Sequence, residues 1–84
     1  MIDQDKIHRM VESENPKERR QAAVAIEKNF SSLPNKEEAW KDLIKLTQDK
    51  DWHVRSSAAE AIGEVFASIP NKELAQNDLH NLTQ

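Results

Sequence analysis

The sequence contains no cysteine and a single glycine, Gly63. Without cysteine, neither disulfide bonds nor thiolate metal ligands can support the fold. One glycine also excludes the glycine-rich loops that cradle phosphate groups. Long apolar runs are missing as well: the first fourteen residues, MIDQDKIHRMVESE, carry scattered charges, which argues against a signal peptide or a membrane span there. We therefore expect a cytoplasmic protein.

The sequence also lacks an excess of positive charge. Twelve Lys and Arg stand against fifteen Asp and Glu, and the net charge of −3 is too balanced for a protein that binds polyanions non-specifically. Charged residues make up 32% and apolar residues 37%, a mixture typical of soluble helical proteins. With 84 residues the chain fits one domain, whose small core buries only about 60% of the surface that the unfolded chain exposes.

An internal repeat organises the chain. Residues 13–48 align with residues 49–84 without a gap, and seventeen of the thirty-six positions are identical. A fixed period of this length predicts a solenoid, in which each unit buries its apolar face by stacking on its neighbour. Residues 2–12 match the second half of a unit and are interpreted as a half repeat that caps the N-terminal end. The sequence therefore predicts one domain over residues 1–84, with two full repeats.

Each repeat is predicted to contain two helices. Asn15 is an N-cap residue, Pro16 fits the first helical position, and Glu18 completes a capping box. Asp51 takes the cap position in the second repeat, and apolar residues then recur every three or four positions. Pro34 and its counterpart in the second repeat end the first helix of each unit. The expected helices are residues 2–12, 16–32, 36–48, 52–68 and 72–83.

The segment DKDWHVRSSAAEAIGEVF, residues 49–66, carries a family resemblance. Its Asp-rich turn, Val-Arg pair, alanine pair and Ala-Ile-Gly run resemble the first helix of a HEAT repeat of the phycobilisome-lyase-like subclass. The resemblance implies an all-α fold, an alpha-alpha superhelix (a HEAT-like solenoid) of about five antiparallel helices. It also implies a structural ladder of Asp and Arg residues between stacked units, and we assign to it Asp51, Arg55, Asn15 and Arg19.

The two ends of the solenoid are expected to differ. In the first repeat Glu18 and Asn29 stand where the second repeat has Val54 and Val65, which suits a unit that faces water near an N-terminal cap. At the other end, an apolar surface formed by Val65, Ile69 and Leu79 is expected to stay partly open. Such a surface can pair with a second copy of the chain, so self-association through this end is a further hypothesis.

In HEAT arrays the second helices line the concave surface where partners usually lie, and the resemblance places a protein-binding face there. Trp40 and Ile44 are one helical turn apart beside the predicted core stripe, and Lys41 and Lys45 flank them. An aromatic side chain ringed by basic residues is what a binding hot spot looks like. The alternative is that Trp40 only fills space against a neighbouring helix. The proposed face comprises Trp40, Lys41, Ile44, Lys45, Gln76, Asn77 and His80.

Catalytic, cofactor and metal sites are not predicted. His53 lies in an expected first helical turn, His80 has only glutamines at helical spacing, and His8 with Asp5 or Glu12 offers at most an adventitious ligand pair. The three histidines are interpreted as solvated surface residues. No spacing of Ser, His and carboxylate indicates nucleophilic catalysis either.

The sequence therefore indicates a non-enzymatic module that binds a protein partner on the face of its second helices. One alternative is a regulatory, non-catalytic segment of a larger enzyme. Another is a HEAT-type groove for DNA or RNA, but the first repeat has a net charge of only +1 and the second of −3, so we consider nucleic acid unlikely.

Overall fold

The regular structure in residues 3–68, the part of the chain that the computed structural model describes, is helical. The elements are α1 (Gln4–Val11), α2 (Pro16–Asn29), a short 3-10 helix η1 (Phe30–Ser32), α3 (Lys36–Leu46) and α4 (Trp52–Ser68). No residue within this range lies in a strand, so the all-α prediction is confirmed. The fifth expected helix, residues 72–83, lies outside the described residues.

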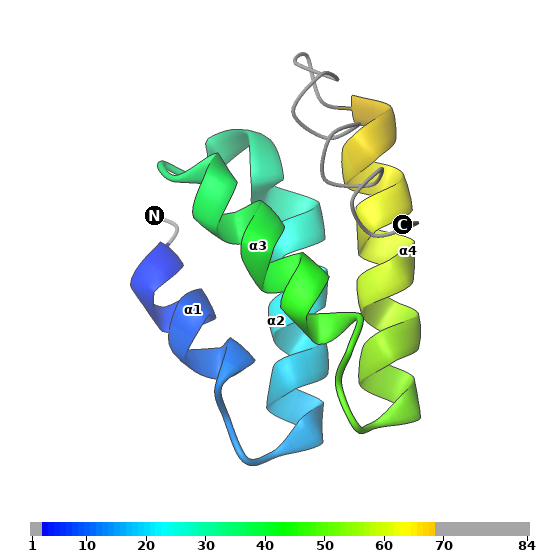
Figure 1. Ribbon diagram of the computed structural model, residues 1–84. Helices are drawn as coiled ribbons and strands as arrows, with labels where there is room; N and C mark the ends of the chain where they lie inside the picture. The colour runs from blue at the N-terminus through cyan, green and yellow to red at the C-terminus, as the bar shows by residue number, and fades with distance from the viewer. Residues whose placement is uncertain (1–2, 69–84) are drawn as a thin grey trace.

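The four helices form two layers (Figure 1). The first helices of the two repeats, α2 and α4, lie side by side, and α1 and α3 pack against them. Ile26, Phe30 and Ile62 are buried between the layers, and Phe66 packs partly buried against them. The rest of the core consists mainly of small and branched side chains: Ile7, Val11, Ala22, Ala23, Leu33, Ala39, Trp40, Leu43, Leu46, Val54, Ala58, Ala61 and Val65.

Side-chain caps begin the helices at the predicted positions. Asn15 Oδ1 accepts from the backbone N–H of Lys17 (2.9 Å), and Asp51 Oδ1 accepts from the N–H groups of His53 (2.8 Å) and Val54 (3.1 Å). These bonds satisfy N–H groups that have no partner within the first turn.

The predicted capping box of α2 is wrong in its detail. The carboxylate of Glu18 accepts from the hydroxyl of Ser13 (2.6 Å), and that hydroxyl oxygen accepts from the N–H of Asn15 (3.1 Å). Glu18 therefore contacts the Asn15 N–H only through Ser13, whose hydroxyl lies two residues before the cap and bridges the two groups.

Three helices are shorter than expected, and α2 shows why. A continuous helix was expected over residues 16–32, but α2 ends at Asn29, whose side-chain amide donates to the carbonyl of Ala25 (2.9 Å). The chain then tightens into η1 and leaves it at Leu33 in extended conformation, as the following Pro34 requires. The helix expected at 2–12 begins at Gln4 and ends one residue earlier than expected, at Val11. The helix expected at 36–48 begins as expected and ends two residues earlier, at Leu46.

We expected an exposed apolar surface at the C-terminal end of the solenoid, and the structure describes one of its three residues, Val65. Val65 is 1% exposed and belongs to the core, so its assignment to an exposed surface for self-association is wrong. The exposed residues next to it on α4, Gly63, Glu64 and Ala67, are polar or small. Ile69 and Leu79, the other two residues of that surface, lie outside the described residues.

Candidate functional site

A line of polar contacts joins α1 to α3, and we call it the α1–α3 seam. It consists of three pairs: Gln4 with Asn35, His8 with Asp42, and Glu12 with Lys45. The three residues on the α1 side are four positions apart, so they lie on one face of the helix and its end. By contrast, α1 and α3 pack through apolar side chains against the layer formed by α2 and α4.

Gln4 closes the first end of the seam. Although it is a polar residue, it is buried, and its side-chain amide makes two hydrogen bonds with the backbone of Asn35. Gln4 Nε2 donates to the Asn35 carbonyl (2.7 Å), and Gln4 Oε1 accepts from the Asn35 N–H (2.9 Å). Asn35 is also the cap of α3, with its Oδ1 accepting from the N–H of Glu38 (3.0 Å). The start of α1 is therefore tied directly to the start of α3.

We expect Gln4→Ala to lower the free energy of unfolding by about 1–3 kcal/mol, because it removes a buried side chain and both of the part-buried hydrogen bonds that this side chain makes with the backbone of Asn35. Chemical denaturation measures the loss. Asp5→Ala, at the next and exposed position of α1, is the matched control and should change stability by less than about 0.5 kcal/mol. Equal effects of the two substitutions would contradict the role of the Gln4 bonds.

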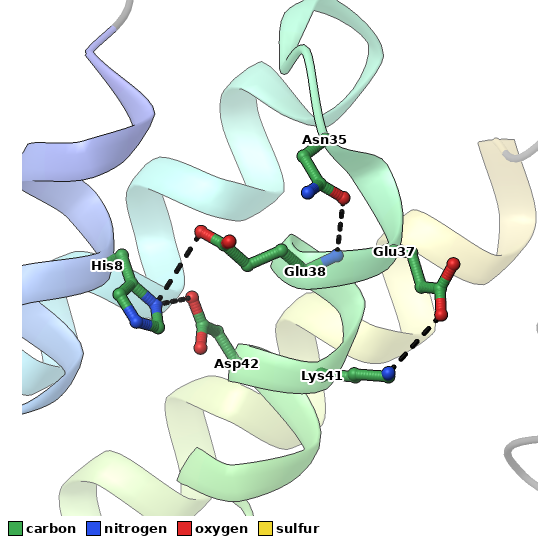
Figure 2. A pocket seen from close by; sticks show the side chains of 6 residues that line it. All are labelled: His8, Asn35, Glu37, Glu38, Lys41 and Asp42. Carbon is green, nitrogen blue, oxygen red and sulfur yellow. Dashed lines mark hydrogen bonds and ion pairs between the residues drawn. The ribbon is translucent and has the colours of Figure 1, made fainter.

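His8 occupies the middle of the seam (Figure 2). Its Nδ1 lies 2.8 Å from Oδ2 of Asp42 and 3.7 Å from Oε1 of Glu38. The imidazole is half exposed, whereas Asp42 is only 6% exposed. The hydrogen bond with Asp42 and the negative charge of that carboxylate raise the pKa of His8 above its ordinary value. Burial raises the pKa of Asp42, and the interaction with His8 only partly offsets that.

Glu12 and Lys45 form an ion pair at the other end of the seam. Both side chains are more than half exposed. Lys45 lowers the pKa of Glu12 through its hydrogen bond and its charge. Because water and salt screen exposed pairs of this kind, we expect this contact to add little to the stability of the fold.

A second polar constellation links the two repeats. The guanidinium of Arg19 makes a bidentate ion pair with Asp49, with Nε 2.7 Å from Oδ2 and Nη2 3.1 Å from Oδ1. Its Nη1 also donates to the carbonyl of Ser13 (2.8 Å). Arg19 is 7% exposed and Asp49 is largely buried. Because Arg19 belongs to the first repeat and Asp49 is the first residue of the second, this pair lies at the junction between the two repeats.

The residues that we assigned to a ladder take different positions around this junction. Arg19 binds Asp49, while Asn15 and Asp51 use their side chains to cap α2 and α4. Arg55 is exposed and donates from Nη1 to the carbonyls of Asp49 (2.8 Å) and Lys50 (3.1 Å). The carboxylate that joins the units is thus Asp49, two positions before the predicted Asp51.

The structure differs most from the predicted binding face at Trp40. This side chain is 2% exposed and forms part of the core, so the interpretation of Trp40 as an exposed anchor is wrong and the alternative that it fills space is right. Ile44 is partly buried against the same core, whereas Lys41 and Lys45 are exposed. Gln76, Asn77 and His80 lie outside the described residues.

Comparison with known protein families places the chain among helical repeat proteins. The family described as HEAT repeats matches residues 5–79, which is most of the chain. The chain belongs to the HEAT repeat family. Comparisons with curated proteins and with solved structures gave no match. Within residues 3–68, no helix of this HEAT repeat protein is both long and apolar enough to cross a membrane.

Sequence reasoning missed the partners of two buried charged residues of this HEAT repeat protein, Asp42 and Arg19. His8 and Asp42 are 34 residues apart and Arg19 and Asp49 are 30 apart, so no helical spacing connects them. A signal for Asp42 was nevertheless present, because it lies beside the apolar stripe of α3 and recurs as Asp78 in the second repeat. The interpretation of His8 as a solvated histidine is therefore incomplete, since one ring nitrogen is held by a buried carboxylate.

Proposed function

We propose that this HEAT repeat protein is a non-enzymatic scaffold module that binds a protein partner on the face formed by its second helices. The observation that carries the proposal is the family match over residues 5–79, because HEAT repeats generally mediate contacts between proteins. The finer resemblance to the phycobilisome-lyase-like subclass and a cytoplasmic location belong to the same proposal.

The exposed residues of α1 and α3 support a polar binding face. Glu37 and Lys41 form an exposed ion pair (3.3 Å), and Lys45 follows one turn later on α3. On the neighbouring α1, Asp5 and Arg9 are exposed. A face of mixed charge favours a partner that carries complementary charges of both signs, and such charges mainly set the association rate and the choice of partner. Gln76, Asn77 and His80 would extend this face.

The test is a charge reversal on the face, with a matched reversal elsewhere. We expect Lys41→Glu/Lys45→Glu to weaken recovery of the native partner about tenfold or more, since like charges then oppose each other across the interface. The control, Lys17→Glu/Arg20→Glu, makes the same change of charge at exposed positions of α2 and should leave recovery unchanged. The measurement is quantitative affinity capture from the native cell, with helix content of each variant checked by circular dichroism.

The proposal fails if the two double variants recover the same proteins in the same amounts as the wild type. It also fails if only the α2 variant loses them, because the partner would then lie on the layer of first helices.

A further inference from the structure

One imidazole and two carboxylates converge in the middle of the α1–α3 seam. Glu38 and Asp42 are one turn apart on α3 and face α1, and His8 of α1 points between them (Figure 2). One donor atom from each of the three side chains lies within 4.8 Å of the other two. An open pocket lined by these residues together with Asn35, Glu37 and Lys41 connects the cluster with solvent.

The spacing of the three donor atoms is close to what a metal ion requires. Zinc binds histidine nitrogen and carboxylate oxygen at about 2.0–2.2 Å, so neighbouring ligands of a tetrahedral site are about 3.3–3.5 Å apart. The distances from His8 Nδ1 to Asp42 (2.8 Å) and to Glu38 (3.7 Å) fall on either side of this value. Shifts of about half an ångström bring these two distances to the tetrahedral value, and the donor oxygens of Glu38 and Asp42, which lie within 4.8 Å of each other, approach to the same spacing around a bound ion.

We propose that His8, Glu38 and Asp42 form a binding site for a divalent transition-metal ion such as Zn²⁺. Two carboxylates and one neutral imidazole carry a formal charge of −2, which balances the charge of the ion. The imidazole ligand favours zinc and its neighbours over Mg²⁺ and Ca²⁺, which prefer sites made of oxygen alone. A fourth position faces the open pocket and is available to water.

The burial of Asp42 is a second observation that points to a ligand. A carboxylate that is 6% exposed is costly unless its charge is compensated, and here it is aimed into the pocket (Figure 2). Among the described residues, the only side chain that makes a hydrogen bond with Asp42 in the structure is the half-exposed His8. A bound cation would compensate the buried charge more completely.

The supporting contacts hold the ligands in place. The two hydrogen bonds between Gln4 and Asn35 hold α1 against α3 on one side of the cluster, and the exposed ion pair of Glu12 with Lys45 connects them on the other. The side-chain oxygen of Asn35 also accepts a hydrogen bond from the backbone N–H of Glu38. Since outer contacts of this kind orient metal ligands, the site needs little rearrangement on binding. The ion would link the half repeat, α1, to the first full repeat.

The experiment is a titration of the untagged full chain, freed of metal with a chelator, with ZnCl₂ in a calorimeter. We expect one bound ion per chain and, at about 100 μM free Zn²⁺, a rise in melting temperature of about 5 °C that excess EDTA reverses. His8→Gln and Glu38→Gln should each weaken binding at least about tenfold and remove the thermal shift. Glutamine keeps the size of the glutamate and can still hydrogen-bond Asp42 from position 8.

Two matched controls keep His8, Glu38 and Asp42 but remove a carboxylate or histidines elsewhere in the chain. Glu37→Gln removes a neighbouring carboxylate of the same pocket, and His53→Gln/His80→Gln removes the other two histidines. Both should bind Zn²⁺ as the wild type does. The proposal is overturned if the wild type shows neither heat nor thermal shift, if His8→Gln and Glu38→Gln bind normally, or if MgCl₂ stabilises the chain as much as ZnCl₂.

Discussion

Trp40→Ala should lower the free energy of unfolding by about 3–5 kcal/mol, as other removals of a buried aromatic side chain do. Trp40 is the largest fully buried side chain in residues 3–68, and it lies in a core made mainly of alanine and branched aliphatic residues. A domain of this size has only about 5–15 kcal/mol of stability, so the expected fall in melting temperature is roughly 15 °C or more. Thermal unfolding followed by circular dichroism measures it.

Trp52→Ala is the matched control, because the second tryptophan of the chain is 63% exposed at the start of α4. That substitution should change the melting temperature by no more than about 3 °C. Trp40→Phe should lie between the two, since it loses volume but also removes a buried Nε1–H that has no hydrogen-bond partner within the described residues. If Trp40→Ala melted like the wild type, Trp40 would have to be exposed in solution.

The position of Trp40 shows what a helical stripe can and cannot predict. A stripe such as Ala39, Leu43 and Leu46 identifies the side of a helix that faces one neighbour. However, α3 contacts α2, α4 and α1, so its buried arc is wider and takes in Trp40 on one edge and Asp42 on the other. The stripe therefore predicted that α3 exists and where its centre packs, but it did not predict its edges.

The internal repeat was the strongest sequence signal for the fold, but it carried little information about the contacts of the α1–α3 seam. Matching positions such as Ile26 and Ile62 show that both copies bury the same face, which is enough to predict helices and their stacking. The α1–α3 seam, in contrast, depends on how a half repeat meets a full one. His8 corresponds to Ile44 in the next unit, so the alignment of the copies carried no sign of the contact with Asp42.

Arg19→Ala should lower the melting temperature by about 10 °C or more, because it leaves the largely buried Asp49 carboxylate without its bidentate partner. Arg55→Ala is the matched control one repeat later. Its exposed guanidinium contacts only carbonyl oxygens among the described residues, so we expect a loss of less than about 3 °C. Comparable losses in the two variants would contradict the special role of the Arg19–Asp49 pair at the junction.

A double-mutant cycle separates the pair from its surroundings. Asp49→Asn removes the charge but can still accept the hydrogen bond from the N–H of Asp51 (2.8 Å). We expect Arg19→Ala/Asp49→Asn to be clearly more stable than the sum of the two single losses predicts, since the second change no longer breaks an ion pair. Additive losses would show that the two side chains do not stabilise each other.

The same pair should make stability depend on pH. Burial raises the pKa of Asp49, but the hydrogen bonds from Arg19 and from the Asp51 N–H outweigh it and hold that pKa below its ordinary value. A carboxyl group whose pKa is lowered by folding stabilises the folded state fully above its unfolded pKa of about 3.9, and this contribution disappears as the pH falls through the lowered pKa. The melting temperatures of the wild type and Asp49→Asn should therefore differ most near pH 7 and converge as the pH falls through the lowered pKa of Asp49. A difference that stays constant from pH 7 to pH 2.5 would mean that the charge of Asp49 does not stabilise the junction between the two repeats.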